Sequence, residues 1–193
     1  MATAASAAFA SLLFASPASG QCFVASGSSI QSLLIPSSIF FFIDDESRSV
    51  QIPLNGFTFP MRGTNWTHFV VTSNGEIFLT DGNGPVGITS VGPGSLSEVR
   101  GAPGESPRII PFGSDLSAGS GPGVWDLLVD DSVANEVKVT WSNVRRFGLT
   151  ANWCVSATLF ASGEVRFDYS DGLSGVPGAT QFVAISAGDG VGT

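Results

Sequence analysis

Apolar and polar residues alternate with a period of two in several short stretches of the chain. Residues 137–142, 155–159 and 165–169 each place an apolar side chain at every second position. This period is that of a β-strand with one buried and one polar face. The Ala-Ser-Gly-Glu sequence at 161–164 predicts a turn between the last two stretches, so 155–169 is predicted to form a β-hairpin with a polar outer face.

An earlier part of the chain repeats this arrangement. Residues 69–71 and 77–79 are apolar, and the Ser-Asn-Gly-Glu sequence at 73–76 predicts a tight turn in which Asn-Gly supplies a positive φ. Further strand candidates are residues 57–59, 124–129 and 182–185. No stretch shows the sustained period of an amphipathic helix. The predicted fold class is therefore all-β, a two-layer antiparallel β-sandwich.

A long segment rich in Gly and Pro interrupts the strand pattern between Leu79 and Ile109. It runs from Thr80 to Arg108. Loops of more than about 12 to 15 residues are usually functional or mobile. Two interpretations are open at this point: a binding loop, or a surface insertion that the fold tolerates.

Charged residues are absent from the start of the chain. Residues 1–43 contain none. Residues 1–20 combine small residues with an apolar stretch and end in Ala18-Ser19-Gly20, which predicts a secretory signal peptide followed by one domain over 21–193. The alternative is an uncleaved hydrophobic strand or helix. We expect no membrane span, because Ser and Thr interrupt the apolar run and about 20 consecutive apolar residues are needed to cross a bilayer.

The composition limits the kind of partner. The chain has 43% hydrophobic residues, which suffices for a core, and eight Lys and Arg against 16 Asp and Glu, a net charge of −8. An acidic chain of this kind has no basic surface for phosphate backbones or anionic lipid. We therefore expect no binding to nucleic acid.

The chain has two cysteines, Cys22 and Cys154. Two cysteines in an exported chain predict one disulfide bond. It would tie the start of the mature chain to a late strand and close a long loop, worth about 4 to 5 kcal/mol of stability. The alternative is two buried free thiols.

The sequence contains few of the residues and motifs that catalysis requires, and we expect that the protein is not an enzyme. His68 is the single histidine, and no nucleophile elbow, Walker loop or zinc-protease motif occurs. Glu164 and Asp168 share a face of one predicted strand. Their spacing of about 13 Å exceeds the separation that glycoside hydrolysis requires, so this pair is interpreted as a solvated face.

Several short motifs follow one another in a characteristic order. They are Phe57-Thr-Phe-Pro, the run from Trp66 through Ser73-Asn-Gly-Glu-Ile-Phe-Leu, Arg108-Ile-Ile-Pro-Phe-Gly-Ser-Asp, the run from Val137 to Trp141-Ser-Asn-Val, the hairpin at Gly163, and Ile185-Ser-Ala-Gly-Asp-Gly. In this order, over about residues 50–190, they resemble nidogen-like (NIDO) extracellular domains and related bacterial secreted β-sandwich modules. The resemblance implies a non-catalytic adhesive or scaffolding part of a matrix or cell-surface protein.

Calcium is the one ligand that the acidic loops suggest. Where members of that family often carry an acidic pair, this chain has Phe-Gly-Ser before Asp115, so one acidic residue remains. Asp81 and Asp189 lie in other Gly-containing turns, and none of the three belongs to an EF-hand calcium motif. We expect no metal and no other cofactor, and we name Asp81, Asp115 and Asp189 as calcium candidates for a thermal-shift test.

These observations predict an exported, non-catalytic structural or adhesive module that binds an extracellular protein or glycan through its loops. One alternative is a carbohydrate-binding module in which an exposed Trp125 or Trp153 stacks on a sugar ring. Another is an accessory domain of a longer secreted enzyme, because the chain reaches Thr193 without an evident terminal cap or anchor. The partner and the oligomeric state are not predicted.

Overall fold

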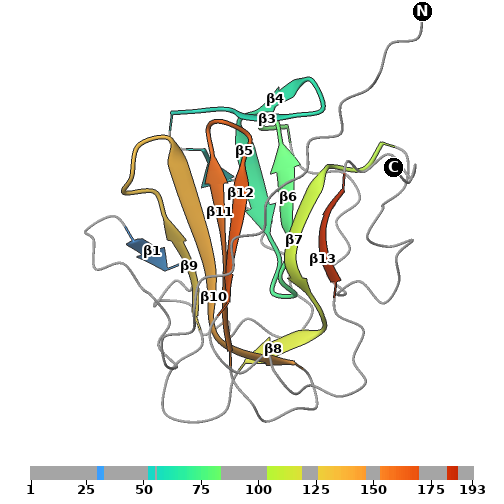
Figure 1. Ribbon diagram of the computed structural model, residues 1–193, viewed down its shortest axis with the longest axis vertical. Helices are drawn as coiled ribbons and strands as arrows, with labels where there is room; N and C mark the ends of the chain where they lie inside the picture. Colours follow the sequence, from blue (N-terminus) through green and yellow to red (C-terminus); the bar gives the residue numbers. More distant parts are fainter. Residues whose placement is uncertain are drawn as a thin grey trace, which may run out of the picture.

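All regular elements in the described part of the chain are β-strands (Figure 1). The computed structural model describes residues 30–32, 52–54, 56–83, 104–118, 126–146, 153–169 and 182–186. The strands are β1 (Ile30–Ser32), β2 (Ile52–Pro53), β3 (Phe59–Met61), β4 (Thr64–Trp66), β5 (His68–Val71), β6 (Ile77–Thr80), β7 (Arg108–Gly113), β8 (Leu116–Ala118), β9 (Asp126–Asp130), β10 (Glu136–Arg146), β11 (Trp153–Phe160), β12 (Val165–Tyr169) and β13 (Phe182–Ser186).

The strands form two main sheets and one separate hairpin. The first sheet has the order β1-β9-β10-β11-β12, with β8 pairing the far end of β10, and the second has the order β13-β7-β6-β5-β2. Strands β3 and β4 pair only with each other. Every pairing is antiparallel. The predicted all-β, two-layer antiparallel sandwich is confirmed.

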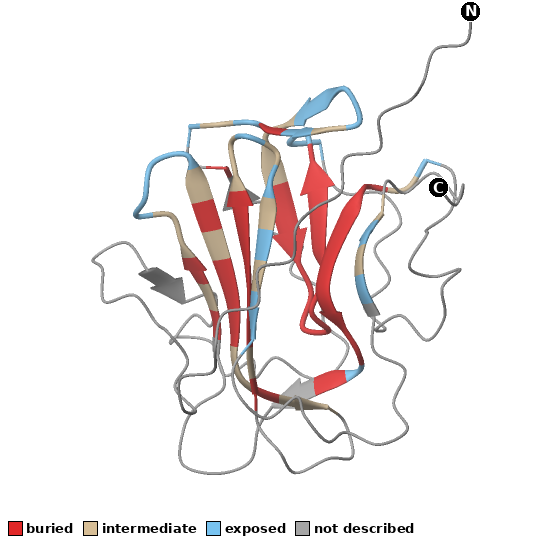
Figure 2. Ribbon diagram, viewed as in Figure 1, coloured by how far each residue is buried: buried red, intermediate tan, exposed pale blue. Residues whose placement is uncertain are grey.

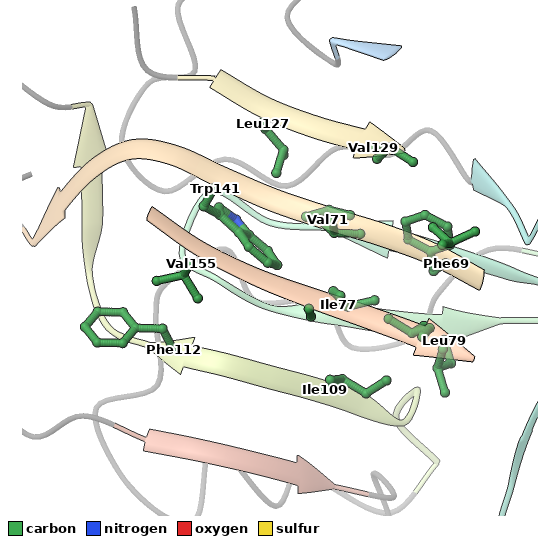
Figure 3. Close-up of a cluster of buried hydrophobic side chains, with 14 of the residues drawn as sticks. Phe69, Val71, Ile77, Leu79, Ile109, Phe112, Leu127, Val129, Trp141 and Val155 are labelled. Atoms are coloured by element: carbon green, nitrogen blue, oxygen red, sulfur yellow. The ribbon is translucent and has the colours of Figure 1, made fainter. Parts of the chain in front are cut away.

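One apolar core lies between the two main sheets (Figure 3). Alternate residues of β10 and β11 point into it, and Trp141 and Trp153 are its largest side chains. The ring of Trp153 meets the ring of Phe112 from the second sheet edge-to-face, with 5.5 Å between centroids. Such contacts stabilise beyond the area that they bury, so these aromatics hold the layers together.

The middle strands of the second sheet are buried on both faces, which the sequence pattern does not predict. In Figure 2 strands β5, β6 and β7 are buried along almost their whole length. Phe69, Ile77 and Ile109 face the core, whereas Val70 and Phe78 point to the opposite side and are equally buried. Antiparallel sheets commonly leave one face to water, and these three strands do not.

Two expectations from the pattern need correction. The outer face of the hairpin at 155–169 is polar as predicted, but on β11 it is not exposed, because Ser156 and Thr158 are buried. They lie on a central strand, where Ser156 Oγ is 3.0 Å from Thr140 Oγ1 and Arg166 donates a hydrogen bond to Thr158 Oγ1. The long segment is also shorter than expected, because Thr80 ends β6 and Arg108 begins β7.

Candidate functional site

Three turns and both ends of the long loop lie at one end of the sandwich, which we call the loop end. Figure 1 shows at this end the β3–β4 hairpin, the β9–β10 turn at 131–135 and the β11–β12 turn at 161–164. The ends of β6 and the start of β7 lie there too, so Asn83 and Gly104, which border residues 84–103, belong to the loop end. Residues 84–103 themselves lie outside the described part.

Backbone contacts hold these turns side by side. The N–H of Ala161 donates a hydrogen bond of 2.9 Å to the carbonyl oxygen of Asn135, which joins two of the turns. Gly163 lies so close to the β3–β4 hairpin that a Cβ atom there would be 2.9 Å from the carbonyl oxygen of Pro60. Gly163 has φ +87°, the conformation that glycine adopts without strain. The three turns of the loop end are therefore assembled against one another.

The side chains of the loop end are mostly polar and exposed. Arg62 and Gly63, at the tip of the β3–β4 hairpin, both have positive φ, as a two-residue hairpin turn requires. Val133 in the β9–β10 turn is 51% exposed. Exposed turns on a rigid scaffold are the positions at which proteins often carry binding residues.

Asp81 is the calcium candidate at the loop end, and its carboxylate closes a turn. Oδ1 accepts a hydrogen bond from the backbone N–H of Asn83 at 2.9 Å, and Oδ2 accepts one from the Asn83 amide at 3.0 Å. These hydrogen bonds, the backbone one first, lower the pKa of Asp81. Both oxygens are thus already engaged with the chain itself.

At the opposite end, the turn that joins β5 to β6 is buried and polar. We call residues 72–76 the buried turn. Its backbone closes through Thr72 N–H and Glu76 C=O at 2.9 Å, and Gly75 has the predicted positive φ, +79°. The Asn74 side-chain oxygen accepts a hydrogen bond from Leu116 N–H at 2.8 Å, and the indole N–H of Trp141 donates one to the Thr72 carbonyl oxygen at 2.9 Å. The buried turn therefore connects both sheets.

A buried ion cluster adjoins this turn. The Arg108 guanidinium is 3.8 Å from Glu76 Oε1, also pairs with Glu105, and lies 4.8 Å above the ring centre of Phe78. Arg108 and Glu76 are 2% and 1% exposed, so dissolved substrate does not reach them. Sequence reasoning missed this cluster: it placed Arg108 at the end of a loop, although the same residue opens the motif shared with the NIDO class.

The two tryptophans of the carbohydrate-binding alternative are not equivalent. Trp153 is 1% exposed and belongs to the core. Its indole face packs against protein and does not present the exposed platform on which a sugar would stack. Trp125 lies outside the described residues, so that half of the alternative stays a prediction.

Of the remaining site candidates, two lie in the described part of the chain. Cys154 lies on β11 and Asp115 is exposed between β7 and β8, whereas Cys22 and Asp189 lie outside the described residues. The Cys22–Cys154 disulfide therefore stays a prediction. Among the residues that the structure describes, no three His, Cys, Asp or Glu side chains gather in a metal-binding arrangement.

The residues considered for catalysis are engaged with their neighbours. His68 is half-buried on β5, with Nδ1 2.8 Å from the hydroxyl of Thr67. Asp168 lies on the exposed face of β12, 3.3 Å from Arg166 Nε.

In the described ranges no helix has the length and apolar character of a membrane span.

Comparison with known proteins adds a family. A family model described as NIDO related matches residues 16–192. No curated protein and no solved structure matches the chain significantly. The match covers nearly the whole chain and agrees with the order of motifs along it. The chain therefore belongs to the NIDO-related family, which indicates an extracellular domain of a larger protein.

Proposed function

We propose that this chain is an exported, non-catalytic structural or adhesive module of a cell-surface or matrix protein, which binds an extracellular protein or glycan through its loop end. Membership of the NIDO-related family is the observation that carries this proposal. In this proposal residues 1–20 direct export and are removed, residues 21–193 form the domain, and the Cys22–Cys154 disulfide closes the mature chain.

The chemistry of the described residues supports a binding role. Asn74, Glu76 and Arg108 are buried polar side chains whose contacts hold strands and turns together. Several of the polar groups exposed in the described part lie on the turns of the loop end, where they are accessible to a partner.

The loop end supports the choice of binding surface. Its turns are fixed to one another through Ala161, Asn135 and Gly163, so a partner would meet a preformed surface. A preformed surface binds with a smaller loss of conformational entropy than independent loops do. The loop between Asn83 and Gly104 leaves from this surface, which supports its interpretation as a binding loop.

The test is a binding screen of mature residues 21–193 against arrays of extracellular proteins and glycans. We expect saturable binding to one class of ligand, and an unrelated acidic β-sandwich of similar size serves as the control. Selective glycan binding would displace the scaffold role in favour of the carbohydrate-binding alternative. Turnover of an arrayed substrate, or binding no stronger than that of the control, would contradict the proposal.

A further inference from the structure

Asparagine is followed directly by glycine at three places in the chain, Asn55, Asn74 and Asn83. In such a pair the backbone nitrogen of the glycine can attack the side-chain amide carbon of the asparagine, because glycine has no Cβ atom to hinder the approach. The outcome is deamidation, which proceeds without an enzyme. Asn55 lies outside the described residues, whereas Asn74 and Asn83 lie in contrasting surroundings.

Asn74 is confined inside the buried turn. It is 0% exposed, and its side-chain oxygen accepts the hydrogen bond of 2.8 Å from Leu116 N–H. Gly75 is confined as well, because its φ of +79° belongs to the closed turn and the Phe112 carbonyl oxygen occupies the place of a Cβ atom. For the reaction the Asn74 side chain must leave Leu116 and turn back onto the Gly75 nitrogen. The closed turn holds both groups in place and prevents this movement.

Asn83 is an exposed asparagine at the loop end. Its backbone N–H and its side-chain amide donate hydrogen bonds of 2.9 and 3.0 Å to the Asp81 carboxylate, and both bonds are exposed. Water can replace such bonds, so each of them adds only about 1 kcal/mol to stability. The Asn83 side chain can therefore be released without any opening of the core. It provides a comparison with Asn74 within the same molecule.

We propose that Asn74 is a latent deamidation site, which is protected while the buried turn is closed and reacts when the turn opens. In the open chain the Gly75 nitrogen forms a bond to the Asn74 side-chain carbon. The bond from that carbon to the amide nitrogen breaks, and ammonia leaves with the proton of the Gly75 N–H. Water then opens the resulting cyclic imide at either carbonyl, which gives aspartate or isoaspartate. The only co-reactant is water.

Opening of the buried turn disrupts contacts with both sheets. The Trp141 indole N–H donates a hydrogen bond of 2.9 Å to the Thr72 carbonyl oxygen, and Leu116 N–H donates the one to Asn74. A segment held in this way opens together with a large part of the domain, in a state that a stable fold populates rarely. The deamidation rate at Asn74 is then the rate in the open chain multiplied by the open fraction. Asn74 therefore records how often this part of the fold opens.

The products do not fit the closed turn. Aspartate at position 74 places a second carboxylate in the buried turn, two residues from Glu76, and a buried charge without a partner of its own is costly. Isoaspartate adds a carbon to the backbone of a turn that packs against Phe112. Deamidation should therefore weaken the closed form and mark chains that have opened. Protection of Asn74 depends on the fold alone and does not rest on the proposed binding function.

Peptide mass spectrometry of the purified protein tests the proposal. The protein is incubated at mildly alkaline pH in buffer and, in parallel, in concentrated urea, and conversion of each asparagine to acid is followed over time. In urea we expect Asn74 and Asn83 to react at similar rates. In buffer the rate at Asn74 should fall by about a hundredfold or more, because the open fraction of a stable domain is small. The rate at Asn83 should change by less than about tenfold.

Reaction of Asn74 in buffer at a rate close to that of Asn83 would overturn the proposal, as would a lack of reaction at Asn74 in urea. Asn74→Asp reproduces one product and should lower the melting temperature by about 4 °C or more. Asn83→Asp is the matched control, because it makes the same change at an exposed position, and it should melt close to the wild type. Equal melting temperatures of the two variants would contradict the misfit of the product. An Asn74→Asp chain that does not fold would support that misfit, and the wild-type rates still test the protection.

Discussion

Two residues show how single polar groups hold strands in place, one between the two sheets and one within the second sheet. Tyr169 joins the edge strand β12 to β7 through its hydroxyl, and Arg108 joins β7 to the turn before β6 through Glu76. Both groups are partly or wholly removed from water, where a hydrogen bond or ion pair is costly to leave unmade. Substitution of either residue should therefore change the free energy of unfolding, and the pKa of Tyr169 can be measured directly.

The titration of Tyr169 is directly observable, because it is the only tyrosine in the chain. Burial raises its pKa from 10.0 to about 12. Since the folded-state pKa lies above the unfolded value, the stability due to the neutral phenol is complete below pH 10 and is lost as the pH rises through 12. Tyrosinate absorbance should therefore show a midpoint near pH 12, falling to about 10 in denaturant.

A midpoint near 10 in the folded protein would show that the Tyr169 hydroxyl is solvated. Tyr169→Phe provides the second measurement. It removes the hydrogen bond to Pro111 while it keeps the ring, and we expect it to lower the free energy of unfolding by about 1 kcal/mol. The variant should also abolish the absorbance change altogether.

Arg108→Met tests the buried ion cluster. Removing one member of a buried ion pair leaves an uncompensated charge, which typically costs about 3 to 5 kcal/mol. Arg166→Met is the matched control, because its pair with Asp168 lies on the surface and should contribute about 1 kcal/mol or less. Urea denaturation of both variants gives the comparison. Equal losses of stability would mean that the Arg108 cluster does not hold the fold together.

At the scale of elements, turns rather than strands determine how the layers meet. The buried turn packs against residues 112–116, and a Cβ atom on Gly75 would clash with the Phe112 carbonyl oxygen. Gly63, in the β3–β4 turn, has almost the same φ, +76° against +79°, but open space around it. Alanine substitutions at the two glycines therefore distinguish the loss of stability caused by the left-handed conformation from the loss caused by steric contact.

Gly63→Ala should lower stability by about 1 to 2 kcal/mol, the cost of a left-handed conformation for an L-residue. Gly75→Ala carries that cost together with a steric clash against backbone, and we expect a further loss of about 1 to 3 kcal/mol. Thermal or urea unfolding measures both. If the two variants lose the same stability, the buried turn is not packed against Phe112 as described.

The elements were predictable where a local pattern determines them. Alternation predicted β10 and β11 because their core-facing residues come from every second position, and Asn-Gly predicted the turn at Gly75 because that conformation is intrinsic to the residue pair. Burial of the outer side of β6 was not predictable, since it depends on what covers Phe78 and not on the strand itself. The burial of Trp153 likewise depends on the residues that cover it, so the sequence allowed it to be interpreted as an exposed binding residue.

For the whole molecule, export and binding are the properties that the sequence suggests and that solution measurements must test. The assembled loop end could not be predicted, because it depends on contacts between turns that are distant in sequence, such as Asn135 with Ala161 and Pro60 with Gly163. The family could be predicted from the sequence, because the motifs occur in the expected order although each motif alone is short.

The disulfide is a prediction at this scale, because it would link Cys22, near the start of the mature chain, to Cys154 on β11. We expect the secreted protein to lack two thiol hydrogens in its intact mass and to lose about 4 to 5 kcal/mol of stability on reduction. The Cys22→Ser, Cys154→Ser double variant should match the reduced wild type. Two titratable thiols in the secreted protein would contradict the pairing.

The claim that the loop end binds a partner can be tested most directly by replacing residues 84–103 with a short Gly-Ser linker in the mature chain. Asn83 and Gly104 lie at the same end of the sandwich, so the linker should preserve the fold and the melting temperature. Binding to the ligand selected from the arrays should then fall by about tenfold or more. Undiminished binding by a variant that melts like the wild type would contradict the account.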